Sequence, residues 1–118
     1  MKGGFELDSK AIKDFIIANN IGERTIKGFW KCFDNYKKEE VEEFSQVFGD
    51  FDNERLTIWM DKVNQSIRNW DKFDNEYNEN HEYIEAFIKL EYKGKYIGWY
   101  SLLFNFDGKT FDDYFVLV

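Results

Sequence analysis

Two turn signals near the C-terminus constrain the fold of this chain more than any other feature. Lys93-Gly94 and Asp107-Gly108 divide residues 83–118 into three segments in which apolar and polar side chains largely alternate. Alternation with a period of two is typical of β-strands, and Asp-Gly between two such segments is a strong hairpin signal. We therefore predict an antiparallel β-meander of three strands with two-residue turns, over residues 83–92, 95–106 and 109–118.

The part of the chain before residue 74 has the apolar spacing of helices. Asp8-Ser9 offers an N-cap for a first helix that stops at residues 19–22, and two further helices are predicted over residues 26–36 and 41–48. A fourth helix, capped by Asp52 or Asn53, is predicted from an apolar stripe that we expect to pack on the sheet: Leu56, Trp59, Met60, Val63, Ile67 and Trp70. The predicted fold class is α+β, with about four N-terminal helices followed by a three-stranded antiparallel meander in one domain, residues 1–118.

Composition supports a folded chain in a reducing compartment. Hydrophobic residues make up 43% and aromatic residues 20% of the 118 residues, which is enough apolar surface for one core. No apolar run approaches the roughly 20 residues that a membrane-spanning helix needs. Cys32 is the only cysteine, so no internal disulfide can form. We expect a cytoplasmic protein that does not enter a membrane.

The negative charge of the chain favours basic proteins over nucleic acid as partners. The formal net charge is −7, and residues 74–118 hold nine of the 23 acidic side chains but only four of the 16 basic ones. Binding to nucleic acid depends on Lys and Arg side chains that neutralise phosphates, so nucleic acid is not the expected partner. A negative field attracts basic proteins and accelerates encounter with them.

Both faces of the predicted meander are apolar. Two-residue turns place Leu90 opposite Ile97 and Trp99 opposite Val116, which gathers one face for the helices: Ile84, Ala86, Ile88, Leu90, Ile97, Trp99, Leu103, Tyr114, Val116 and Val118. The opposite face gathers Phe87, Tyr96, Tyr100, Leu102, Phe104, Phe106, Phe111, Phe115 and Leu117. An exposed patch of that size is unusual on a monomer, so we expect helices, a second copy of the chain or another partner to cover it.

No motif for catalysis, a metal ion or a cofactor stands out, and we do not expect an enzyme. His81, the only histidine, lies in a polar stretch beside Glu79 and Glu82. Residues 74–85 have the ligand spacing of an EF-hand loop, but Glu79 occupies the position that needs glycine. Cys32 has apolar neighbours and fits a buried thiol better than a nucleophile, which needs an electropositive setting.

The acidic run over residues 71–85 is the most distinctive electrostatic feature, and it predicts a surface that docks onto a basic protein. The partner-binding residues that we predict are the acidic and aromatic side chains of this run and of the strands: Asp71, Asp74, Glu76, Glu79, Glu82, Glu85, Phe87, Tyr100, Phe104, Asp113 and Phe115.

In general character the chain resembles bacterial immunity proteins of contact-dependent growth inhibition and polymorphic toxin systems. It is small, acidic and free of proline, and it ends in the aromatic hairpin FNFDGKTFDDYFVLV. The resemblance implies an inhibitor of a cognate basic toxin domain, such as a nuclease, whose active site it would mask with Asp and Glu.

Two alternatives remain open. Helices followed by curved antiparallel strands are similar to the cone-shaped fold of the nuclear-transport-factor/SnoaL-like superfamily, where Glu85 or Asp113 would be a carboxylate buried in a ligand pocket or active site. That fold needs more long strands than three. The other alternative is a homodimeric structural or phage-encoded protein, with Phe104 and Phe115 near the two-fold axis.

Overall fold

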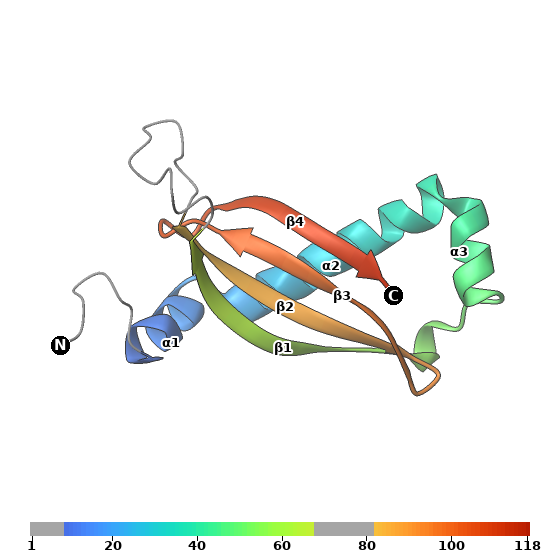
Figure 1. Ribbon diagram of the computed structural model, residues 1–118, viewed down its shortest axis with the longest axis horizontal. Helices are drawn as coiled ribbons and strands as arrows, with labels where there is room; N and C mark the ends of the chain where they lie inside the picture. The colour runs from blue at the N-terminus through green and yellow to red at the C-terminus, as the bar shows by residue number, and fades with distance from the viewer. Residues whose placement is uncertain (1–8, 68–81) are drawn as a thin grey trace.

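The computed structural model describes residues 9–67 and 82–118 as three helices followed by a four-stranded antiparallel sheet. The helices are α1 (Ser9–Ala18), α2 (Ile21–Glu39) and α3 (Val41–Phe48), and the 3-10 turn η1 (Asn53–Arg55) leads into the sheet. The strands β1 (Leu56–Ile67), β2 (Glu82–Tyr92), β3 (Lys95–Phe104) and β4 (Thr110–Leu117) form a meander in the order β1-β2-β3-β4 (Figure 1). The predicted α+β class is confirmed.

The predicted fourth helix is wrong, because Leu56–Ile67 is strand β1 paired with β2. A β-bulge at Asp61 shifts the register between Met60 and Lys62. Ile58, Met60 and Val63 therefore all face the core, and the step of three residues from Met60 to Val63 imitates helical spacing. The sheet has four strands where the sequence predicted three.

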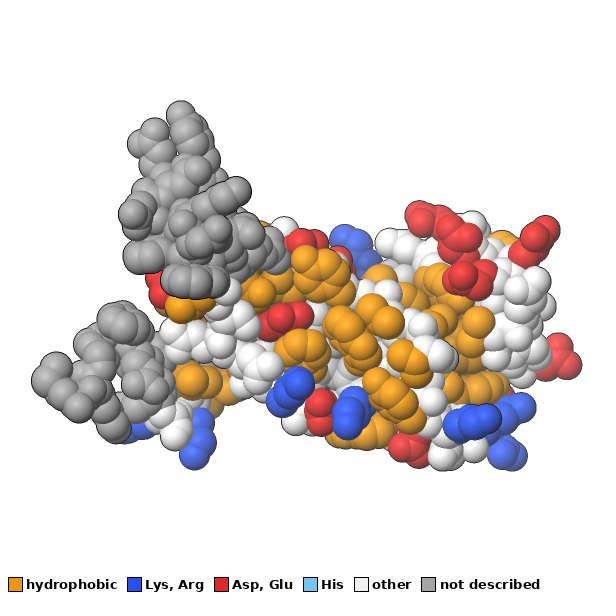
Figure 2. Space-filling model, in the orientation of Figure 1, with side chains coloured by type: hydrophobic (Ala, Val, Ile, Leu, Met, Phe, Trp, Pro, Cys, Tyr) orange, Lys and Arg blue, Asp and Glu red, His pale blue; other side chains and the backbone are white. Residues whose placement is uncertain are grey.

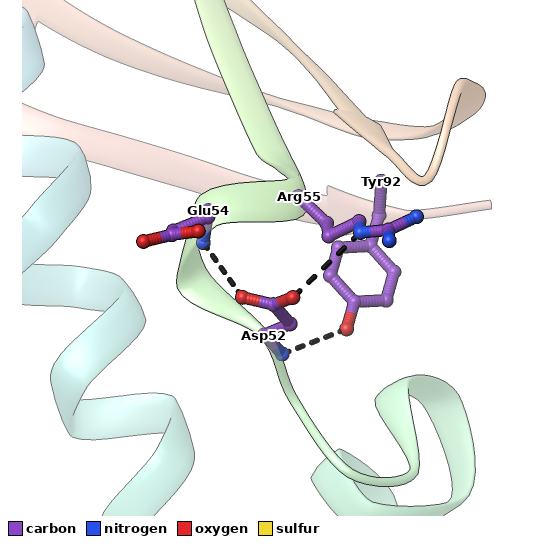
Figure 3. A network of polar contacts seen from close by, with 4 residues as sticks. All are labelled: Asp52, Glu54, Arg55 and Tyr92. Carbon is purple, nitrogen blue, oxygen red and sulfur yellow. Dashed lines mark hydrogen bonds and ion pairs between the residues drawn. The ribbon is translucent and has the colours of Figure 1, made fainter.

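The predicted cap at Asp52 is present, but it closes the turn η1 and not a long helix. Asp52 Oδ1 accepts a hydrogen bond from Glu54 N at 3.1 Å, and Asp52 N donates to Tyr92 Oη at 2.9 Å (Figure 3). Arg55 Nε lies 3.7 Å from Asp52 Oδ2. These contacts fix the point where the chain leaves α3 and enters β1 beside the end of β2.

Helix α2 lies along one face of the sheet (Figure 1). It begins at Ile21, earlier than predicted, and its buried residues Ile21, Thr25, Phe29 and Phe33 recur every four positions along one side. Phe29 and Phe33 both contact Phe115 edge to face, and Phe33 also packs against Phe44 and Phe48 of α3. The core is thus an aromatic layer between α2, α3 and the sheet.

The predicted faces of β3 and β4 are exchanged relative to β2. The predicted two-residue turn at Lys93-Gly94 is present, and both of its residues have positive φ, as in a type I′ turn. A register shift between Leu90 and Glu91 then places Ile88 opposite Tyr100, not opposite Trp99. The face under α2 accordingly combines the predicted core residues of β2 with residues assigned to the opposite face: Tyr100, Leu102, Phe104, Phe115 and Leu117.

Glycine at position 98 is required by this arrangement. Its φ is +153°, and a Cβ atom there would lie 2.1 Å from the Val116 carbonyl oxygen of β4. The close approach of the β4 backbone leaves no room for a side chain at this position of β3. The Asp107-Gly108 turn, in contrast, is not a two-residue turn, since β3 ends at Phe104 and β4 begins at Thr110.

No helix of the described ranges packs on the other face of the sheet. Phe87 and Trp99 lie there with ring centroids 5.6 Å apart, and Trp59 and Tyr96 are exposed. Lys62 and Lys89 lie over aromatic rings of this face, and Figure 2 shows apolar side chains gathered across it. Helices therefore cover one of the two apolar faces and, in the described part of the chain, not the other.

Candidate partner-binding groove

An open groove of about 910 Å³ lies between α2 and the β4 side of the sheet. We call it the α2–β4 groove. Polar, charged and apolar residues of α2 and the sheet line it together: Arg24, Lys27, Gly28, Lys31, Cys32, Asn35, Tyr36, Glu39, Glu40, Tyr100, Leu102, Thr110, Phe111, Asp112, Asp113 and Phe115.

The hydroxyl of Tyr100 forms the floor of the groove. Tyr100 is fully buried, and its Oη donates a hydrogen bond to Asp113 Oδ2 on β4 at 2.9 Å. Gly28 makes room for this hydroxyl at the surface of α2. Burial and the Asp113 carboxylate raise the pKa of Tyr100 far above its ordinary value, so the phenol stays protonated and donates.

One end of the groove is closed by Arg24. Its Nη1 donates to the carbonyl oxygens of Gly108 at 2.8 Å and Asn19 at 3.2 Å, and its guanidinium lies 4.9 Å from the centre of the Phe104 ring. These contacts join the start of α2 to the loop between β3 and β4. Because Arg24 is occupied in this way, it positions the strand rather than offering a free cation to a ligand.

The other end of the groove is electronegative. Burial, Asp113 and Glu39 all raise the pKa of the Cys32 thiol, which places both carboxylates close to it. Burial, Glu43 and Glu40 likewise raise the pKa of Tyr36. The raised pKa favours the protonated thiol, and Cys32 is half-buried at the groove where the sequence predicted a buried thiol.

Several carboxylates that line the groove have no ion pair among the described residues. In the described ranges, ion pairs join Lys10 to Asp14, Lys27 to Glu23, Arg55 to Asp52 and Lys89 to Asp61. Glu39, Glu40, Asp112 and Asp113 belong to none of these pairs, and all four residues are exposed. Four carboxylates therefore line the groove without an ion pair in these ranges, as does the Lys31 ammonium, and the rings of Tyr36 and Phe115 line it as well.

Tyr36 adds a polar group that the fold does not satisfy. Its Oη is buried and has no hydrogen-bond partner at bonding geometry among the described residues, even though Glu43 lies close enough to raise its pKa. Its ring contacts Phe115 with centroids 5.3 Å apart. A ligand group that accepts or donates a hydrogen bond at this position would recover the lost interaction.

The structure brings three predicted site residues together and separates others. Tyr100, Asp113 and Phe115 all line the groove, although Tyr100 and Phe115 were expected on the face away from the helices. Phe104 is fully buried in the core. Glu85 and Phe87 lie on the other face of the sheet, where Glu85 Oε2 accepts a hydrogen bond from Ser101 Oγ at 2.6 Å.

The rest of the predicted acidic surface is only partly visible. Glu82 begins β2, but Asp71, Asp74, Glu76 and Glu79 lie outside the described residues. His81 and most of the run with EF-hand spacing, residues 74–85, also lie outside them. Among residues 9–67 and 82–118, no group of three His, Cys, Asp or Glu side chains could hold a metal ion.

Sequence reasoning missed the contribution of α2 to the groove. Gly28, Cys32 and Glu39 are spaced by four and then seven residues and so share one side of the helix, but the sequence pattern alone does not say which strands that side meets. The glycine inside a helix was the available signal, because a helix interior tolerates glycine poorly without a packing reason.

Comparisons with known protein families, curated proteins and solved structures found no match for this chain. No helix within the described ranges is both long and apolar enough to cross a membrane.

Proposed function

We propose that this chain is a protein-binding inhibitor that receives a basic segment of its partner in the α2–β4 groove. The observation that carries the proposal is a set of four exposed carboxylates that have no ion pair among the described residues, Glu39, Glu40, Asp112 and Asp113, in a groove that the rings of Tyr36 and Phe115 also line. Lys or Arg side chains of a partner would neutralise these charges. Aromatic rings beside the carboxylates add cation–π attraction to the same groups.

The overall charge supports the same kind of partner. A net charge of −7 attracts a basic protein over a longer range than the groove alone and increases the rate of encounter. The resemblance to bacterial immunity proteins supplies the finer proposal: the partner is a cationic toxin domain, and binding covers its active site.

The test is capture of partners from the native host with the tagged chain, at low and at raised salt. Asp113→Lys combined with Glu39→Lys reverses the groove charge, and Glu42→Lys combined with Glu54→Lys reverses two exposed carboxylates elsewhere. We expect a basic protein that the wild type and the control variant retain and that the groove variant loses. The captured protein should then lose its activity when the wild-type chain is added.

A basic partner retained equally by the groove variant would overturn the groove as the binding site. Loss with charge reversal at Glu82 and Glu85 but not in the groove would return the contact to the acidic run predicted from sequence. Capture of a partner whose activity is unchanged would reject the inhibitor role while leaving the contact in place.

A small cationic ligand is the second candidate. The volume of the groove lies within the range of small-molecule sites, and the buried hydroxyl of Tyr36 lacks a partner. Titration with simple amines distinguishes the two functions. An amine that binds tightly without displacing a captured protein partner favours a ligand-binding domain.

A further inference from the structure

Strand β4 is an edge of the sheet, and the α2–β4 groove runs beside it. The strand order β1-β2-β3-β4 leaves one side of β4 without a neighbouring strand in the described part of the chain (Figure 1). Five β4 residues line the groove together with α2: Thr110, Phe111, Asp112, Asp113 and Phe115. An edge strand carries a row of backbone groups that can pair with another chain.

The register shows which of these backbone groups point outward. Val118 N donates to Ile97 O at 2.9 Å, so the antiparallel ladder directs the N–H groups of residues 112, 114, 116 and 118 toward β3. The alternate residues Asp113, Phe115 and Leu117 then direct theirs away from the sheet. Asp113 N agrees with this assignment, because it donates to Asp112 Oδ1 at 2.9 Å and not to β3.

Asp112 and Asp113 decide which chain can pair with this edge. They lie near the middle of Thr110–Leu117. Pairing of two β4 strands along their full length would bring two copies of each carboxylate together, which like-charge repulsion disfavours. A second copy of this chain is therefore a poor occupant, and a strand with Lys or Arg at the facing positions is a good one.

The side-chain directions define that strand further. Asp113 and Phe115 lie on the face of the sheet that α2 covers, opposite Leu102 and Tyr100. An added strand would direct every second side chain to the same face, and hence into the groove toward Glu39 and Tyr36. Basic side chains at those alternate positions would meet the carboxylates that lack partners.

We infer that the partner is held by β-augmentation: an extended basic segment pairs with the edge of β4 and lies in the α2–β4 groove as a fifth strand. This inference rests on the proposed function and adds the conformation of the bound segment. The main-chain hydrogen bonds would supply affinity, and the carboxylates would select basic residues.

The experiment uses the full chain and the probe peptide acetyl-KVKVKVK-amide, with two analogues that carry N-methyl groups on all valines or on all lysines after the first. Successive N–H groups of a strand point to opposite edges, so each analogue blocks one edge and keeps the side chains. We expect one analogue to lose about tenfold or more in affinity, equivalent to about 1.4 kcal/mol, and the other to bind nearly as the unmodified peptide does. Hydrogen exchange at the Phe115 and Leu117 amides should slow when the peptide binds.

Equal binding of both analogues and the unmodified peptide, without slower exchange at Phe115 and Leu117, overturns β-augmentation. Failure of the unmodified peptide to bind overturns it as well. The proposed function is judged separately, because it stands or falls with the loss of the captured partner on Asp113→Lys and Glu39→Lys, whichever conformation the bound segment has.

Discussion

Gly28 and Tyr100 are fitted to each other across the interface between α2 and β3: a Cβ atom at Gly28 would lie only 2.6 Å from Tyr100 Oη. The hydroxyl cannot move aside easily, because Tyr100 is fully buried and bonded to Asp113. Glycine in a helix interior costs about 1 kcal/mol relative to alanine, so its presence here reflects this contact.

Gly28→Ala should therefore destabilise the wild type by about 1–2 kcal/mol, since overpacking exceeds the gain in helix propensity. In a Tyr100→Phe background the same change should stabilise by up to about 1 kcal/mol, because the nearest remaining ring atom is 3.5 Å away. Urea denaturation of the four proteins gives the coupling energy. Equal effects of Gly28→Ala in both backgrounds would show that the two residues do not interact.

Stability should fall at alkaline pH. The folded-state pKa values of Tyr100 and Tyr36 are raised above the unfolded value near 10. The folded chain therefore holds these two phenol protons more tightly than the unfolded chain, and protonation stabilises the fold. This contribution is complete below pH about 10 and is lost as the pH rises further. The free energy of unfolding should be level between pH 7 and 9 and fall above about 10. A Tyr100→Phe, Tyr36→Phe variant should show a shallower fall, and an unchanged slope would contradict the assignment.

The Cys32 thiol reports the charge of the groove. Its pKa is raised by burial and by Asp113 and Glu39, so it should react slowly with a thiol reagent at pH 8. Asp113→Asn should lower this pKa and accelerate the reaction several-fold. Glu42→Gln, which removes an exposed charge of α3, is the control and should leave the rate unchanged. Equal rates in all three proteins would place Asp113 too far from the thiol to matter.

Asp112 should protect the edge of β4 from unwanted pairing. Its carboxylate occupies the outward N–H of Asp113 and adds a charge to an exposed strand. Asp112→Ala should increase self-association in sedimentation experiments. Asp107→Ala removes the same charge from the exposed loop before β4 and should not. If both variants associate equally, the loss of net charge explains the effect and the edge does not.

Strand alternation, turn residues and helical apolar spacing predicted the elements whose own residues determine their structure. Strands β2 to β4 followed from alternation and from the two glycine turn signals, and the helix over residues 41–48 followed from its apolar spacing. The strand β1 was missed because the bulge at Asp61 gives its core residues a helical spacing. The register shift between Leu90 and Glu91 was missed because it lies within the strand pair. The Lys93-Gly94 turn, from which the register was counted, has regular geometry and gives no sign of it.

Some residues of the candidate groove were predicted as partner-binding residues, but the strand register places them on a different face of the sheet from the one expected. Tyr100 and Phe115 were chosen as residues of an uncovered face, yet they line the groove from beneath α2, and Asp113 reaches it from the edge strand. Glu39 and Cys32 could not be assigned to the site, because the placement of a helix over particular strands depends on packing across the whole sheet. Those contacts lie far apart in the sequence.

The dissociation constant of the captured basic partner tests the central claim most directly. It should rise at least about tenfold for the Asp113→Lys, Glu39→Lys variant and change little for the Glu42→Lys, Glu54→Lys control. The difference should shrink as salt is raised, because exposed charges are screened. Equal dissociation constants for the two variants would contradict the account, since the partner would then recognise total charge and not the α2–β4 groove.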